Sequence, residues 1–186
     1  MEITTKFQYW INVAVHTSYK LEEYSRPEFV GAYEVPDNLN ELTIGQIISL
    51  SGINDSKEPF YRICDIILGM NKQEVDEARA IDVVRFVGWV YAEVKKINKL
   101  FESTSIKPTQ SEVKAGIKQL NFGLFGMLDW YAKRMGYTNH DDVLNVGWMR
   151  IYKCLDMDAK TTLFQRKMQE NLENDYRRKN RAVSRR

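Results

Sequence analysis

The apolar residues near the start of the chain alternate with polar ones. Over residues 6–15 the odd positions are apolar or aromatic, and most of the even positions are polar. This period of two predicts a half-buried strand, whereas Trp10 and Ala14 break the alternation and leave an amphipathic helix open as the alternative. The apolar run 29–35, which a proline follows, is the expected pairing strand. We therefore expect residues 1–36 to form a small N-terminal β element or arm.

After residue 36 the apolar residues recur every three or four positions, which indicates helices. Thr43 is placed to cap a short helix, which the pair Ser51-Gly52 ends. Pro59 suits the first turn of a second helix, and Gly69 suits its end.

The clearest helical pattern covers residues 81–101. Its apolar residues keep helical spacing for about six turns, and lysines gather near its end, where the helix dipole favours positive charge. A short polar helix is expected just before it, at 72–78. We expect the long helix to form the centre of a first helical subdomain, residues 37–103.

Residues 102–110 contain Ser, Thr and Pro and predict a linker to a second helical subdomain, residues 111–176. Helices are expected at 112–120 and at 122–135, and Gly136 suits the end of the latter. Thr138 followed by Asp141 resembles a capping box that opens a further short helix.

Gly147 and Trp148 are expected to begin the next helix, which should end near Leu155. Asp156 or Asp158 is then placed to cap a long final helix. Apolar residues almost vanish after Leu172, so this helix should project from the body. The predicted fold class is mainly α: a compact multi-helix bundle of short helices with a small N-terminal β element and a long projecting C-terminal helix.

The charge of the chain is concentrated at its end. The 27 basic and 25 acidic residues give a net charge of +2, and 44% of the 186 residues are hydrophobic, enough for a core. Six basic residues lie in the last ten positions, which leaves 21 basic against 25 acidic residues elsewhere. They form a basic tail, residues 177–186: Arg177, Arg178, Lys179, Arg181, Arg185 and Arg186. The tail suits contact with nucleic acid, such as DNA, or with an acidic partner, and a solubilising, partly disordered terminus is the alternative.

The two cysteines, Cys64 and Cys154, lie in apolar helical runs and fit free thiols in a reduced, cytosolic setting. No apolar stretch reaches the roughly 18 to 20 residues of a membrane helix, and the first residues do not form a secretion signal. We expect no membrane association.

No pattern in the sequence indicates an enzyme, a cofactor or a metal site. His16 and His140 stand outside zinc-binding spacings, and the run His140-Asp141-Asp142 fits a helix N-terminus better than a ligand set. The glycines of residues 121–126 lack the spacing of a phosphate-binding loop, and close helix packing explains them better.

Residues 128–148 have the outline of a helix-turn-helix, with Gly136 at the turn. Its second helix would present Asp141, Asp142 and Asn145 without Lys or Arg. Because binding to DNA depends on neutralising phosphate charge, we do not expect this segment to recognise DNA.

Two segments resemble bacteriophage tail assembly proteins. Residues 35–46 are similar to the opening Pro-x-x-Leu/Trp-x-Glu-Leu/Ile-Thr-Leu/Ile-Gly-Gln, in which a short strand leads into the first helix of an all-helical unit. A second likeness covers 114–117, Phe122-Gly123 and 131–137, followed by a short helix that ends near Trp148. The resemblance spans about two-thirds of the chain.

The resemblance implies a chaperone that coats the long helical tape-measure protein and delivers it to polymerising tail-tube subunits, without nucleotide or metal. It further implies action in the host cell cytoplasm and absence from the finished particle. The alternative is a structural virion protein of the tail or neck, whose basic terminus contacts DNA. Either protein could form a homo-oligomer.

A chaperone of this kind would grip amphipathic segments of its partner through apolar helix faces. We expect the partner contacts on the first helix and on the projecting helix: Ile44, Ile47, Ile48, Phe164, Met168 and Leu172.

Overall fold

A computed structural model describes residues 5–14, 25–53 and 58–183. Its elements follow one another as α1 (Phe7–Ala14), β1 (Phe29–Val30), β2 (Tyr33–Glu34), α2 (Ile44–Ser51), α3 (Glu58–Leu68), α4 (Lys72–Glu77), α5 (Ala80–Ser103), α6 (Gln110–Lys114), the 3-10 helix η2 (Ile117–Leu120), α7 (Gly123–Met135), α8 (His140–Leu144) and α9 (Trp148–Val183). The predicted fold class is confirmed: the chain is mainly helical, with one small β hairpin and a long C-terminal helix.

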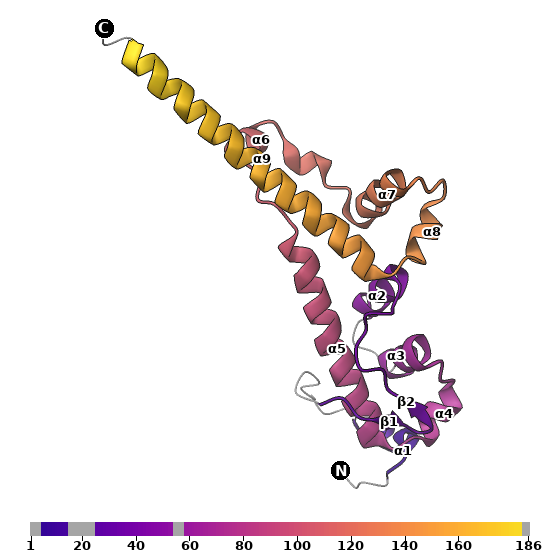
Figure 1. The fold of residues 1–186 in the computed structure, drawn as a ribbon. Coiled ribbons are helices and arrows are strands. Elements are labelled where there is room, and N and C mark those ends of the chain that lie inside the picture. The colour runs from indigo at the N-terminus through magenta and orange to yellow at the C-terminus, as the bar shows by residue number, and fades with distance from the viewer. Residues whose placement is uncertain (1–4, 15–24, 54–57, 184–186) are drawn as a thin grey trace.

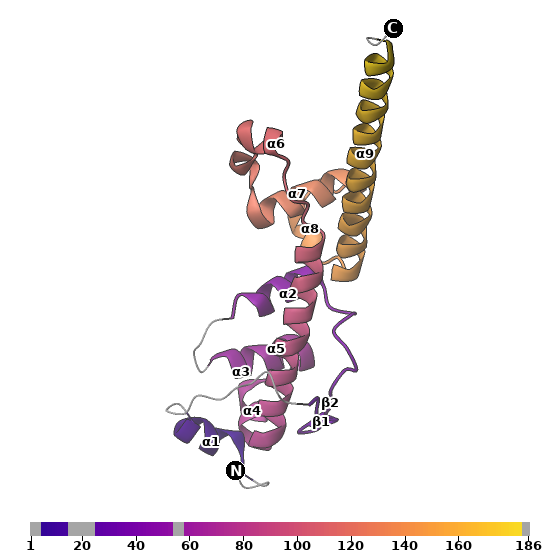
Figure 2. The same cartoon turned by 90° about the vertical axis from the view of Figure 1, so that its left-hand side faces the viewer.

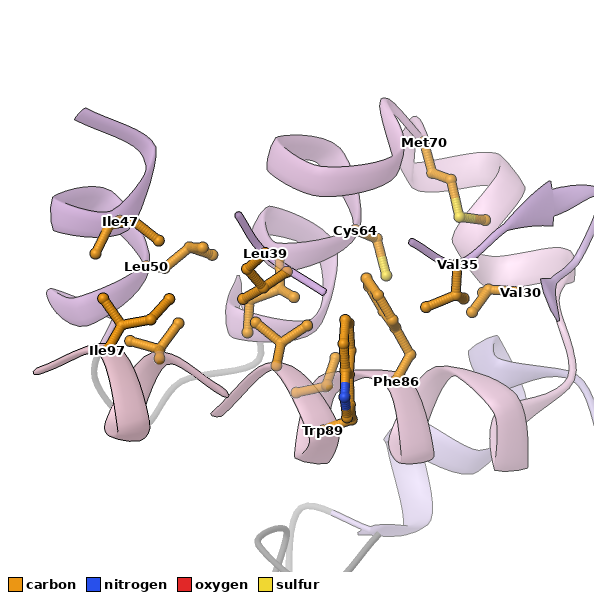
Figure 3. Close-up of a cluster of buried hydrophobic side chains, with 14 of the residues drawn as sticks. Val30, Val35, Leu39, Ile47, Leu50, Cys64, Met70, Phe86, Trp89 and Ile97 are labelled. Carbon is orange, nitrogen blue, oxygen red and sulfur yellow. The ribbon is translucent and has the colours of Figure 1, made fainter. Parts of the chain in front are cut away.

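The core is built on α5, as the spacing of residues 81–101 predicts. Phe86 and Trp89 point from α5 towards α3, and Ile97 faces the apolar side of α2 (Figure 3). The β hairpin closes one end of this core with Val30 (Figure 3). The four elements share one cluster of buried side chains, which holds the N-terminal half together by hydrophobic burial.

Residues 7–14 form a helix, so the predicted strand is wrong. Phe7, Trp10 and Ile11 are buried on one side of α1, whereas Tyr9 is exposed. These positions follow the helical spacing of three and four, and the ring of Phe7 packs 5.2 Å from that of Phe60 on α3. Within the described part of residues 1–36, the β element consists of β1 paired with β2.

The predicted helix ends of the first half are confirmed. Thr43 and Gln46 form a capping box at the start of α2, which ends at Gly52. Pro59 lies in the first turn of α3. Gly69 follows α3 with a φ of +68°, a conformation that glycine adopts without steric cost.

The second half departs from prediction at three points. The helix expected at 112–120 is divided into α6 and η2 by Gly116, whose φ is +87°. The cap of α8 is Asn139, whose side chain accepts the amide hydrogen of Asp141, so the predicted capping box of Thr138 is wrong. Gly136 ends α7 as expected.

The third departure is that α9 is one helix of 36 residues, without the predicted break near residue 156. Asp156 and Asp158 do not cap a helix; their carboxylates pair with Lys160 and Arg134 instead. At 1.5 Å per residue α9 is about 54 Å long. It runs past the body, and among the described elements its C-terminal end lies farthest from α1 (Figures 1 and 2).

The two predicted helical subdomains are joined by direct backbone contacts. Ile44 N–H at the start of α2 donates to the carbonyl of Val146, and Trp148 N–H donates to the carbonyl of Leu42. Buried residues of α7, α8 and α9 belong to the same apolar cluster as those of α5.

Candidate protein-binding surface

Exposed apolar side chains are concentrated in the C-terminal half. Thirteen of the sixteen large hydrophobic residues that are exposed in the described part of the chain lie between Val113 and Tyr176. A contiguous exposed apolar patch on a folded protein usually marks a site where another molecule binds. The unequal distribution therefore places the candidate surface on α6, η2, α7 and α9.

Two of the three predicted contacts on α2 are not available to a partner. Ile44 and Ile47 are each only 2% exposed, because α2 packs between α5 and α8. Ile48 is half-buried against the same core. The expectation that Ile44 and Ile47 contact a partner is therefore wrong: their apolar face serves the fold of this chain.

The predicted contacts on the projecting helix are exposed. Phe164, Met168 and Leu172 are 66%, 47% and 57% exposed, and Tyr176 continues the row. These four residues, which we call the α9 stripe, are spaced by four, so each step turns about 40° around the helix. The stripe winds slowly around α9 over about three turns.

The face of α9 opposite the stripe is held by the rest of the chain. Arg166 lies two residues, about 200°, from Phe164. Its guanidinium donates to the Lys107 carbonyl at 3.0 Å and to a Glu112 carboxylate oxygen at 2.8 Å, which ties α6 to α9. Arg134 on α7 pairs with Asp158 at 2.7 Å. The body thus covers one face of α9 and leaves the stripe open.

A second exposed group precedes and begins α7. Leu120, Phe122, Leu124 and Phe125, which we call the α7 cluster, are all exposed. The cluster lies within the helices expected at 112–120 and 122–135, and none of its residues was among the predicted partner contacts. The missed signal is their crowding: four large apolar residues within six positions cannot all face one side of a helix.

An apolar groove of about 350 Å³ lies between α7, the segment after α5, and α9. Its apolar lining includes Met127 and Trp130 of α7, Ile106, and Leu155 of α9, and Asp158 lies at its edge. Gly126 also lines the groove, and a Cβ at this position would lie 2.9 Å from the Phe122 Cβ, so Phe122 of the α7 cluster borders the groove. The groove is therefore continuous with that exposed surface and has the size of a pocket for one or two side chains.

The basic residues of the tail lie on the last turns of α9, which continues to Val183. Arg177, Arg178, Lys179 and Arg181 are exposed, and the helical repeat distributes them around the axis rather than along one face. Arg185 and Arg186 lie outside the described residues, as does His16. The tip of α9 therefore carries positive charge over about 200° of its circumference, at the far end from the N-terminal body (Figure 1).

Cys64 and His140 are both held in structural positions. Burial raises the pKa of the Cys64 thiol to about 12, which disfavours the reactive thiolate. His140 Nε2 lies 3.2 Å from the Asp129 carboxylate and joins α8 to α7, while Asp141 and Asp142 stand exposed in the first turn of α8. Within residues 5–14, 25–53 and 58–183, no group of three or more His, Cys, Asp or Glu side chains is placed to hold a metal ion.

Comparison with protein-family models, with curated proteins and with solved structures gave no match. Among the described helices, none combines the length and the apolar character needed to cross a membrane.

Proposed function

We propose that this chain is a non-enzymatic assembly protein that binds another polypeptide through the apolar surface of its C-terminal half. The observation that carries the proposal is the unequal distribution of exposed apolar residues between the two halves. The N-terminal half uses its apolar residues for a core around α5. The C-terminal half presents the α7 cluster and the α9 stripe to solvent, where they are available to an amphipathic helix.

The finer proposal is a tail assembly chaperone that binds a tape-measure protein. It is supported by the resemblance of residues 35–46 and 131–137 to bacteriophage tail assembly proteins. A tape-measure protein is a long helical chain, and helices with an apolar face are the ligands that such a surface suits. The expected place of action is the host cell cytoplasm.

Co-expression with the tape-measure protein of the same genome tests this proposal. We expect the two proteins to co-purify, and we expect the double variant Phe122→Ser, Phe125→Ser to weaken the complex at least about tenfold through the loss of two aromatic contacts. Phe29→Ser is the matched control, because Phe29 is an exposed aromatic residue of the N-terminal half. Separate elution of the two wild-type proteins at micromolar concentration would contradict the proposal.

The second candidate is a structural virion protein of the tail or neck whose basic terminus contacts DNA. The observation that favours it is the position of Arg177, Arg178 and Lys179 at the free tip of α9, away from the body. Mass spectrometry of purified particles separates the candidates. A stoichiometric copy number supports the structural protein, whereas absence from the particle supports the chaperone.

A further inference from the structure

The order of side-chain types along the α9 stripe is the same from either end. An aromatic residue stands at each end, Phe164 and Tyr176, and a flexible or branched aliphatic residue stands at each inner position, Met168 and Leu172. The midpoint of the row is Glu170. A second copy turned end for end about this midpoint would place Phe164 opposite Tyr176 and Met168 opposite Leu172. Such a self-complementary order is the condition for an interface with two-fold symmetry.

We infer that the α9 stripe binds a second copy of this chain, so that two α9 helices cross in antiparallel orientation at the level of Glu170. The inference rests on the proposed function in one respect. The proposed function uses both exposed apolar surfaces, and the inference assigns one of them, the α9 stripe, to self-association. The α7 cluster is then left for the different polypeptide.

The spacing of the stripe fixes how the helices cross. Residues separated by four form a ridge inclined to the helix axis, and two such ridges interlock when the helices cross at about −50°. A straight coiled coil instead needs apolar residues that alternate between spacings of three and four. The contact is therefore short and limited to the stripe, and the dimer should be in equilibrium with monomer at micromolar concentration.

The charges beside the stripe favour the antiparallel orientation. About the same midpoint, Gln165 of one copy lies at the level of Asp175 of the other, and both positions are within about 40° of the middle of the stripe, so the Gln165 amide can donate to the Asp175 carboxylate. A parallel pair would instead bring together the two positive tips, each with Arg177, Arg178 and Lys179. Glu170 itself lies on the face away from the stripe, so the two copies of its carboxylate do not meet.

The body of the chain leaves room for the second helix. Arg166, which binds Glu112 and the Lys107 carbonyl, lies on the side of α9 opposite Phe164. The bodies of an antiparallel pair therefore lie at opposite ends of the crossing. Each positive tip, residues 177–183, would lie at the level of residues 157–163 of the other copy. The first 176 residues of that copy hold 25 acidic and 21 basic residues, so the tip approaches a chain of negative net charge.

Light scattering after gel filtration, over a micromolar to millimolar range of chain concentration, tests the inference. We expect the mass to rise from monomer to dimer, and we expect Met168→Glu with Leu172→Glu to shift the midpoint upward by about a hundredfold or more, because two carboxylates would have to be buried. Leu163→Glu is the matched control. Leu163 is 53% exposed on the same helix but about 160° from the middle of the stripe, so its variant should dimerise like the wild type.

Cross-linking with a short bifunctional maleimide reports the orientation. Wild-type chain gives the background from Cys154. We expect a mixture of the Gln165→Cys and Asp175→Cys chains to cross-link more strongly than either chain alone. A wild-type mass that stays monomeric, a dimer that survives Met168→Glu with Leu172→Glu, or cross-linking that is stronger within each single variant would overturn the inference.

The two proposals fail separately. Loss of the dimer in the stripe variant with retained binding of a tape-measure protein leaves the proposed function intact and supports the assignment of the surfaces. Loss of partner binding in the Phe122→Ser, Phe125→Ser variant with an unchanged dimer supports the same assignment. A wild-type dimer without any partner binding removes the chaperone proposal and leaves the self-association.

Discussion

The indole N–H of Trp148 donates a buried hydrogen bond of 2.8 Å to the carbonyl of Leu39, 109 residues earlier in the chain. This bond joins the start of α9 to the segment before α2. The ring also contacts Phe101 near the end of α5, at a centroid distance of 6.1 Å. Trp148 therefore sets the point from which the projecting helix leaves the body.

Trp148→Phe should destabilise the chain by about 0.5–1.5 kcal/mol, because it removes this buried hydrogen bond, while the Leu39 carbonyl keeps the bond that it accepts from Leu42 N–H at 3.3 Å. Urea unfolding followed by circular dichroism measures the change. Trp130→Phe is the control, since Trp130 is only partly buried and lines the open groove beside α9. Equal stability of Trp148→Phe and wild type would show that this bond does not fix α9.

The helix ends of the first half and the central helix could be predicted from sequence because local residues determine them. The apolar spacing of α5, the capping box of Thr43 and the positive φ of Gly69 each depend on neighbours within a few positions. Residues 7–14 could not, since their pattern fits both periods in part. The packing of Phe7 against Phe60 on α3 decides for the helix, and that contact is distant in sequence.

Local sequence is equally insufficient to predict the candidate surface. Ile47 on α2 and Met168 on α9 both belong to apolar rows with helical spacing, yet one is buried and the other is exposed. Which row is covered depends on what lies opposite it in the fold. Sequence spacing predicts that a face exists, and only the tertiary arrangement shows whether the chain itself covers that face.

Gly45→Ala should weaken the contact between α2 and α8. A Cβ at position 45 would lie 2.9 Å from the backbone carbonyl oxygen of Leu144, which cannot move without moving α8. We expect a loss of about 1–3 kcal/mol, as for other overpacked sites, measured by urea unfolding. Gly147→Ala is the control: a Cβ there meets no atom within 4 Å, so its stability should equal or slightly exceed that of wild type. A neutral Gly45→Ala would contradict the close approach.

Mild acid should release α6 from α9. The pKa of Glu112 is held below its usual 4.5, first by the Thr109 backbone N–H and hydroxyl, with Arg166 adding to the effect. A carboxylate with a lowered folded-state pKa stabilises the fold above its unfolded pKa, and that contribution is lost as the pH falls through the folded value.

We therefore expect amide exchange of residues 110–114, corrected for the intrinsic rate, to be slow at neutral pH and to quicken below about pH 4.5. Glu112→Gln should show faster exchange already at neutral pH and little change in that region on acidification. An acid response of the variant as large as that of wild type would assign the effect to other carboxylates.

The two cysteines should differ in reactivity towards a thiol reagent at neutral pH. Cys64 is fully buried in the core and its pKa is raised to about 12, so it should react only when the chain unfolds. Cys154 is partly exposed on α9 and should react in the native protein. We expect one modified thiol per native chain and two in guanidinium. Cys154→Ser should abolish the native reaction, and a rapid native reaction of that variant would show that the core opens around Cys64.

The two parts of α9 should differ in hydrogen exchange when the chain is dilute. Residues from Trp148 to Thr162 pack on α5, α7 and the segment after α5, whereas every described residue from Lys167 to Arg181 is exposed. A helix without tertiary packing is marginal in water, so the distal part should exchange rapidly while the proximal part stays protected. Mass spectrometry of exchanged peptides measures both.

Raising the chain concentration should protect the peptide around Met168 and Leu172 more than the tip after Arg178, because the proposed crossing covers only the stripe. In the Met168→Glu, Leu172→Glu variant this dependence on concentration should disappear, and in Leu163→Glu it should remain. Strong protection of the whole distal part in the dilute wild type would mean that α9 is stable by itself, and the stripe would then not need a second chain to order it.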